Sequence, residues 1–174
     1  MRPDNYFIEF ARSEIDQSVA DRFEKQVVLR PDRLAVKTKL HQLTYRDFNG
    51  LANRIARAVR QRSHNNEPVA LLLEHDASAL VSIFGVLKAG KCFVPLDPSL
   101  PKSRLEFMLD DAGAELIVTN DQRLSLAREL LDTSRGIIDL DRLDASTGTE
   151  NLGLSISPDS VTCILYTSGI TGRP

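Results

Sequence analysis

The residues with the clearest capacity for chemistry stand together in the last part of the sequence. Residues 167–174 read TSGITGRP and directly follow an apolar run, VTCILY. Gly169 and Gly172 permit positive φ angles and a close approach of the backbone to a ligand. Hydroxyl groups beside the free backbone N–H groups come from Thr167, Ser168 and Thr171. Closely spaced N–H and O–H donors of this kind are suited to bind a phosphate group.

The loop matches neither of the two common nucleotide-binding motifs. In the Walker A pattern the glycines are further apart than Gly169 and Gly172, and a lysine follows the second glycine. The dinucleotide pattern GxGxxG does not occur anywhere in the chain. Taken alone, a turn of this composition is more often an ordinary polar turn after a strand. Its position after an apolar strand favours a ligand site, since open α/β sheets bind their ligands at strand ends.

Other residues that could do chemistry have simpler interpretations. His75 and Asp76 follow a predicted strand, but we expect Asp76 to cap the next helix and not to orient a catalytic base. His41 and His64 lie in polar turns without a second histidine at metal-binding spacing. Cys92 and Cys163 each sit in an apolar run, which predicts two buried free thiols.

The elements that must position the loop alternate along the chain. Apolar runs predict strands over residues 34–36, 42–43, 69–73, 91–96, 115–119, 136–140 and 161–167, and helical periodicity predicts helices over 18–31, 45–59, 77–90, 104–113 and 122–131. We expect Ser18 and Thr44 to cap the first two helices. The alternation predicts an α/β fold, with helices packed on a mainly parallel β-sheet.

Composition and charge narrow the classes of partner. Hydrophobic residues make up 42% of the 174 residues, and 22 basic residues nearly balance 24 acidic ones. Without a basic cluster we expect no nucleic-acid partner, and without a long apolar run no membrane partner, so the sequence predicts a cytoplasmic protein. Arg54, Arg57 and Arg60 share one face of the second helix, which we expect to be solvated or, alternatively, to dock a neighbouring domain.

Four segments in the same order resemble one known family. YTSGITGRP resembles the phosphate loop of the adenylate-forming enzymes. LTYRDFNGLANRIARAVR and LKAGKCFVPLDPSLPKSRLEFMLDDAGAELIVT resemble two conserved segments of the amino-acid-activating adenylation domains of nonribosomal peptide synthetases, and SVADRFEKQVVLRPDRLAV resembles the segment that precedes them. The resemblance covers the chain from Ser18 to its last residue, and it identifies residues 166–174 as the phosphate loop.

The resemblance implies a two-step reaction. An amino acid and ATP, with Mg²⁺, give an aminoacyl-adenylate and pyrophosphate, and the acyl group then passes to the phosphopantetheine thiol of a carrier domain. Donors are needed where negative charge sits on the departing pyrophosphate. The resemblance assigns that contact to five loop residues: Thr167, Ser168, Gly169, Thr171 and Gly172.

The chain departs from the family pattern within the loop and after it. Ile170 stands where the family usually has Ser or Thr, and the lysine and glycine that follow the proline in the family do not follow Pro174. The resemblance implies that residues 1–174 are the N-terminal portion of an adenylation domain, without the amino-acid pocket, the magnesium-binding acid and the catalytic lysine. We therefore expect the isolated chain to be inactive.

Two alternatives stay open at this point. The chain could be a non-catalytic module, either a split-gene product or a partner-binding remnant, or it could derive from an acyl-CoA or aryl-acid ligase of the same superfamily. The apolar run Val161–Tyr166 would also leave an unpaired strand edge, which predicts self-association through the sheet.

Overall fold

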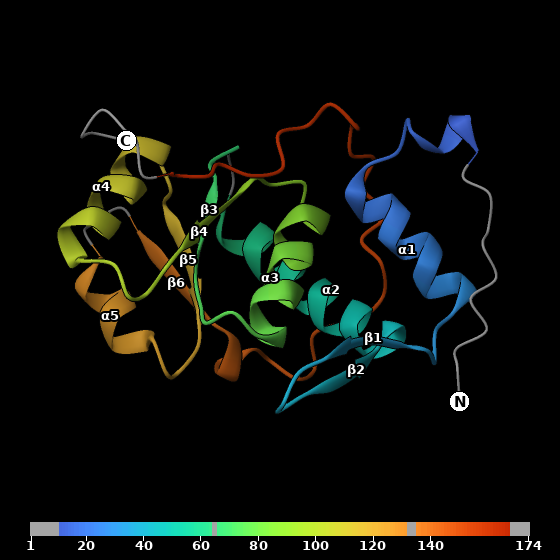
Figure 1. Cartoon of the computed structure of the whole chain (residues 1–174), viewed down its shortest axis with the longest axis horizontal. Helices are drawn as coiled ribbons and strands as arrows, with labels where there is room; N and C mark the ends of the chain where they lie inside the picture. The colour runs from blue at the N-terminus through green and yellow to red at the C-terminus, as the bar shows by residue number, and fades with distance from the viewer. Residues whose placement is uncertain (1–10, 64–65, 132–134, 168–174) are drawn as a thin grey trace.

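The computed structural model describes residues 11–63, 66–131 and 135–167 (Figure 1). Its centre is a sheet of four parallel strands in the order β4-β3-β5-β6. The strands are β3 (Val69–Leu72), β4 (Phe93–Leu96), β5 (Leu116–Thr119) and β6 (Gly136–Asp139). Every residue of β3 and β5 is buried, as expected for parallel strands that helices cover on both faces. The predicted α/β fold is confirmed.

Helices cover both faces of this sheet. The strands separate α2 (Tyr45–Arg62) and α3 (Ala77–Lys88) from α4 (Lys102–Ala112) and α5 (Leu124–Glu129) (Figure 1). Each face has its own apolar cluster, one around Ile55 and Val86 and the other around Leu105 and Leu109. The short 3-10 helix η1 (Arg12–Glu14) is the first element of the described residues, and a second one, η2 (Leu140–Arg142), follows β6.

The N-terminal elements pack outside α2 and α3. Helix α1 (Val19–Leu29) packs Phe23 against two aromatic rings that also contact each other, with its ring centroid 5.0 Å from that of Phe48 and 4.5 Å from that of Phe84. Strands β1 (Leu34–Lys37) and β2 (Gln42–Thr44) form an antiparallel hairpin that leads into α2. This layer extends the core beyond the sheet.

The predicted helix caps are confirmed. The side chain of Ser18 accepts a hydrogen bond from the backbone N–H of Asp21, and Thr44 forms a capping box with Asp47. Asp76 caps α3 by accepting from the N–H of Ser78, at 2.8 Å. These caps satisfy N–H groups that have no partner within their helices.

The prediction of a regular last strand is wrong. Residues 161–167 form a single parallel bridge, between Cys163 and Phe93 at the start of β4. Two backbone hydrogen bonds of 3.0 Å make this bridge, one from Phe93 N–H to Thr162 O and one from Ile164 N–H to Phe93 O. Among the described residues, a strand neighbour lies on one side of this segment only, and Val161 and Leu165 are 69% and 65% exposed. The apolar run therefore lacks the second neighbour that a buried strand needs.

The prediction of a solvated arginine face on α2 holds for Arg60, which is exposed, and is wrong for Arg54 and Arg57, which are half-buried. The side chain of Arg54 donates to the backbone oxygens of Thr147 and Ala145, at 3.2 and 3.0 Å. Arg57 lies 3.7 Å from the carboxylate of Glu150. The polar segment after η2 covers this face, because carbonyl and carboxylate oxygens of that segment pair with the guanidinium groups.

Candidate functional site

The described part of the predicted phosphate loop is its first two residues. Tyr166 is half-buried and Thr167 is exposed. Ser168, Gly169, Thr171 and Gly172 lie outside the described residues. The assignment of these four residues to phosphate binding stays a prediction.

Tyr166 anchors the base of the loop on α4. Its hydroxyl donates to Asp111 Oδ2 at 2.7 Å and lies 3.3 Å from the backbone oxygen of Met108. Its ring contacts Phe107 edge-on, with centroids 6.5 Å apart. Burial, and then the hydrogen bond to Asp111, raise the pKa of the Tyr166 phenol to about 12. The phenol is therefore neutral at physiological pH and acts as a donor.

This anchor fixes which edge of the sheet the loop base occupies. Asp111 belongs to the last turn of α4, which leaves the carboxyl end of β4 and returns to the beginning of β5. The bridge at Phe93 likewise involves the first residue of β4. The structure thus places Tyr166 near the edge where the parallel strands begin, on the face covered by α4, and not at their carboxyl ends as the sequence suggested.

Three aspartates form a cluster at the carboxyl edge of the sheet, and the sequence pattern did not predict this cluster. Carboxylate oxygens of Asp121, Asp139 and Asp141 lie within 4.8 Å of one another. Asp141 Oδ2 accepts from the N–H of Asp121 at 2.8 Å, and Asp139 Oδ1 accepts from the N–H of Asp141 at 3.1 Å. Arg142 Nε lies 3.1 Å from Asp139 Oδ2. Burial raises the pKa of the Asp139 carboxyl. The hydrogen bonds and the ion pair of the three carboxylates indicate that they stabilise the turns after β5 and β6.

The remaining candidates have structural roles or altered surroundings. His75 is exposed, as the capping role of its neighbour Asp76 allows. Cys92 and Cys163 are free thiols, as predicted, but both are half-buried and not fully enclosed. Cys163 forms the bridge with Phe93, and Cys92 directly precedes Phe93. The bridged segment has a described strand neighbour on one side only, which explains the partial exposure of both thiols. Burial raises the pKa of the Cys92 thiol.

In the part of the chain that the structure describes, no helix is long and apolar enough to cross a bilayer.

Comparison with known sequences identifies the family. The sequence model described as "AMP-binding enzyme" matches residues 23–174. The chain is 38% identical over 153 residues to "Zwittermicin A synthase ZmaJ" of Bacillus cereus, which covers 87% of the chain and 29% of that protein. It is 37% identical over 170 residues to the "Dimodular nonribosomal peptide synthase" of Bacillus subtilis (strain 168), covering 95% of the chain and 7% of that protein. The chain thus spans less than a third of either relative.

Comparison with solved structures also finds a nonribosomal peptide synthetase among the similar proteins. A nonribosomal peptide synthetase, FmoA3, in its alpha-methyl-L-serine-AMP bound form, matches with a TM-score of 0.80 at 26% identity, covering 88% of this chain and 17% of that one. The anthranilate CoA ligase AuaEII in complex with anthranoyl-AMP matches with a TM-score of 0.80 at 21% identity, covering 91% and 33%; at that identity the likeness shows the fold alone. With the family model matching all but the first residues, the chain belongs to the AMP-binding enzymes, and its relatives are nonribosomal peptide synthetases.

Proposed function

We propose that residues 1–174 serve as the N-terminal portion of an amino-acid-activating adenylation domain in a nonribosomal peptide synthetase. The observation that carries this proposal is the family match from residue 23 to residue 174, which runs through the segment Tyr166–Pro174. In the complete enzyme an amino acid and ATP react to aminoacyl-AMP and pyrophosphate. The acyl group then passes to the phosphopantetheine thiol of a carrier domain.

The loop residues take the phosphate role in this proposal. The hydroxyls of Thr167, Ser168 and Thr171 and the N–H groups of Gly169 and Gly172 contact the phosphates of ATP, which carries Mg²⁺. Support comes from Thr167, whose exposed position directly after the anchored Tyr166 leaves its hydroxyl free to meet a ligand. Donors placed where charge builds up on a leaving pyrophosphate accelerate attack on the α-phosphorus.

The comparisons favour an amino acid over an aryl or fatty acid as substrate. Curated relatives at 37–38% identity include the zwittermicin A synthase ZmaJ, gramicidin S synthase 2 and the dimodular nonribosomal peptide synthase. One solved relative of this group, FmoA3, is bound to alpha-methyl-L-serine-AMP, an amino-acid adenylate. The likeness to the anthranilate ligase is weaker in sequence, at 21% identity. We therefore place the ligase alternative second.

The test uses amino-acid-dependent exchange of labelled pyrophosphate into ATP. We expect no exchange with the 174-residue chain alone, because residues for the amino acid, magnesium and the catalytic lysine are expected elsewhere in the enzyme. Exchange is expected when the chain replaces the matching segment of the dimodular Bacillus subtilis synthase, to which it is 37% identical. Exchange by the chain alone would overturn the proposed division of the domain. An inactive replacement, with the parent synthase active, would favour the non-catalytic module.

A further inference from the structure

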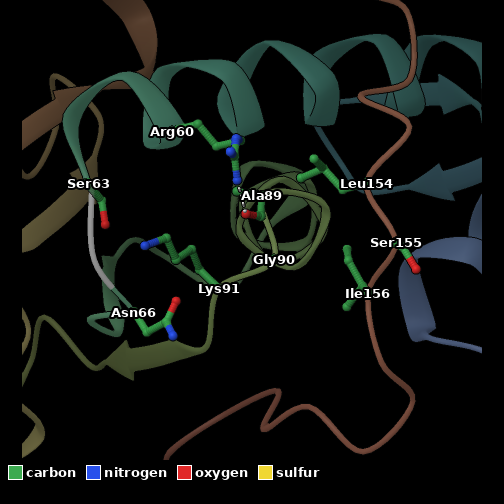
Figure 2. A pocket seen from close by; sticks show the side chains of 9 residues that line it. All are labelled: Arg60, Ser63, Asn66, Ala89, Gly90, Lys91, Leu154, Ser155 and Ile156. Atoms are coloured by element: carbon green, nitrogen blue, oxygen red, sulfur yellow. Dashed lines mark hydrogen bonds between the residues drawn. The ribbon is translucent and has the colours of Figure 1, made fainter.

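A polar cavity of about 360 Å³ lies on the α2–α3 side of the molecule (Figure 2). Its walls come from the last turns of α2, the start of the segment before β3, the turn between α3 and β4, and residues 154–156. The volume lies within the range of small-molecule sites. The cavity is separate from the predicted phosphate loop, whose base packs against α4 on the other face of the sheet.

The end of α3 fixes a lysine at this cavity. Gly90 has φ of 74°, a left-handed conformation that favours glycine. The N–H of Gly90 donates to Leu87 O at 2.9 Å and the N–H of Lys91 to Val86 O at 3.1 Å, the pattern of a Schellman motif. Helix termination therefore holds the backbone of Lys91 in one place, and its side chain extends toward Ser63 and Asn66 (Figure 2).

Among the described residues, the ammonium of Lys91 has one partner, the carboxylate of Glu67. Lys91 is 8% exposed, and its Nζ lies 3.7 Å from Glu67 Oε2. No other described residue receives a hydrogen bond or ion pair from it, and Glu67 Oε2 also accepts from Ser63 Oγ at 2.9 Å. An ammonium carries three N–H donors, and those that do not point at Glu67 are available to an acceptor in the cavity that Lys91 lines. The cavity can therefore supply an additional acceptor.

Arg60 adds a second positive charge. Its Nη1 donates to the backbone oxygen of Ala89 at 3.4 Å, a contact that caps the C-terminal end of α3 (Figure 2). The Arg60 side chain lines the cavity and is otherwise exposed. With the carboxylate of Glu67 counted, Arg60 and Lys91 leave one net positive charge, which suits a monoanion.

The opposite wall is apolar. Residues 154–156 run in an extended course, and Figure 2 shows the side chains of Leu154 and Ile156 directed toward the cavity while Ser155 turns away. This wall lies beside Gly90, where a Cβ would be at an ordinary contact distance of 4.0 Å from Ile156 Cγ1. A ligand bound here would meet cations on one side and aliphatic carbon on the other.

We propose that this cavity binds a small organic monoanion, a carboxylate that carries a short aliphatic group. The carboxylate accepts hydrogen bonds from Lys91 and Arg60, and the aliphatic group packs on Leu154 and Ile156. The site is distinct from the proposed ATP contact, and it does not depend on the reaction proposed above.

The test follows the backbone amides of the ¹⁵N-labelled chain by NMR while sodium isobutyrate is added at constant ionic strength. We expect saturable shifts at Gly90, Lys91 and Ile156. Isobutyramide, the neutral isostere, should give none, because it lacks the charge. Lys91→Gln should weaken isobutyrate binding by about tenfold or more, Lys91→Arg should retain it, and Glu67→Gln should strengthen it by removing the competing carboxylate.

The matched control is Lys102→Gln, which removes an exposed lysine paired with Glu106 at 3.6 Å on α4; its binding should equal that of the parent chain. Absence of saturable shifts with isobutyrate would overturn the proposal. Equal shifts with isobutyramide would overturn it as well, since charge would then play no part. Unchanged binding by Lys91→Gln with a parent-like amide spectrum would show that the ammonium serves only its ion pair with Glu67.

Discussion

Two segments of this chain are similar in their apolar composition and differ in their strand neighbours. Residues 69–73 and residues 161–166 are both apolar runs that predict a strand. The first contains β3, which pairs with β4 on one side and β5 on the other and is fully buried. The second makes one bridge to β4, and its residues Val161 and Leu165 are largely exposed. An apolar run shows that a segment can be buried, while strand neighbours decide whether it is.

The comparison predicts a large difference between two leucines. Leu72→Ala removes a side chain with no exposed surface at the centre of the sheet and should lower the free energy of unfolding by about 2–5 kcal/mol. Leu165→Ala, at a side chain that is 65% exposed, should change it by less than about 0.5 kcal/mol. Urea unfolding followed by circular dichroism measures both. Equal losses would show that the second segment is as well packed as β3.

Close packing beside β3 predicts the next largest effect. A Cβ on Gly85 of α3 would lie 2.6 Å from Ile55 Cγ2 of α2, so Gly85→Ala should destabilise by about 1–3 kcal/mol. Gly50→Ala is the matched control in a helix, because its Cβ would meet Thr149 at an ordinary 3.5 Å. There the higher helix propensity of alanine should stabilise by up to about 1 kcal/mol. Thermal unfolding of both variants gives the sign, and a stable Gly85→Ala variant would contradict the close crossing of α2 and α3.

The segment after the bridge should depend on its tyrosine anchor more than on its strand contacts. Tyr166→Phe removes the hydrogen bond to Asp111 and should cost about 0.5–1.5 kcal/mol. Hydrogen exchange at Ile164 N–H, which bonds to Phe93 O, should also become faster. The amide of Val118 in β5 serves as the internal control and should keep its exchange rate. Unchanged exchange at Ile164 would show that the bridge holds without the anchor.

The same anchor predicts a pH effect at the alkaline end. The folded chain holds the Tyr166 pKa at about 12, above the value of about 10 for a free phenol. Because the folded state favours the neutral form, the contribution to stability is complete below pH about 10 and is lost as the pH rises toward 12. Absorbance titration of the phenols measures this, and Asp111→Asn should lower the Tyr166 pKa. A Tyr166 phenol that titrates normally would contradict the contact.

Local signals in the sequence predicted most of the fold, and distant contacts escaped it. Ser18 and Thr44 cap helices through bonds to residues three positions away, which a sequence shows directly. Arg54 instead bonds to Thr147, 93 positions away, in a segment without periodicity. The polar cavity at Lys91 depends in the same way on residues 154–156. For the candidate site, sequence and resemblance supplied the loop residues, but the anchoring of Tyr166 on α4 needed the structure.

We propose that the loop of residues 166–174 holds the phosphates of ATP in an amino-acid adenylation enzyme. The most direct measurement uses the Bacillus subtilis synthase in which this chain replaces the matching segment. The rate of amino-acid-dependent pyrophosphate exchange is compared between that protein and its Thr171→Val variant. Loss of that hydroxyl should lower the rate by roughly 100-fold. Thr147→Val, in the polar segment that covers α2, should leave the rate unchanged, because Arg54 bonds to the backbone oxygen of Thr147 and not to its hydroxyl. Equal rates with and without the Thr171 hydroxyl would contradict its role in holding phosphate.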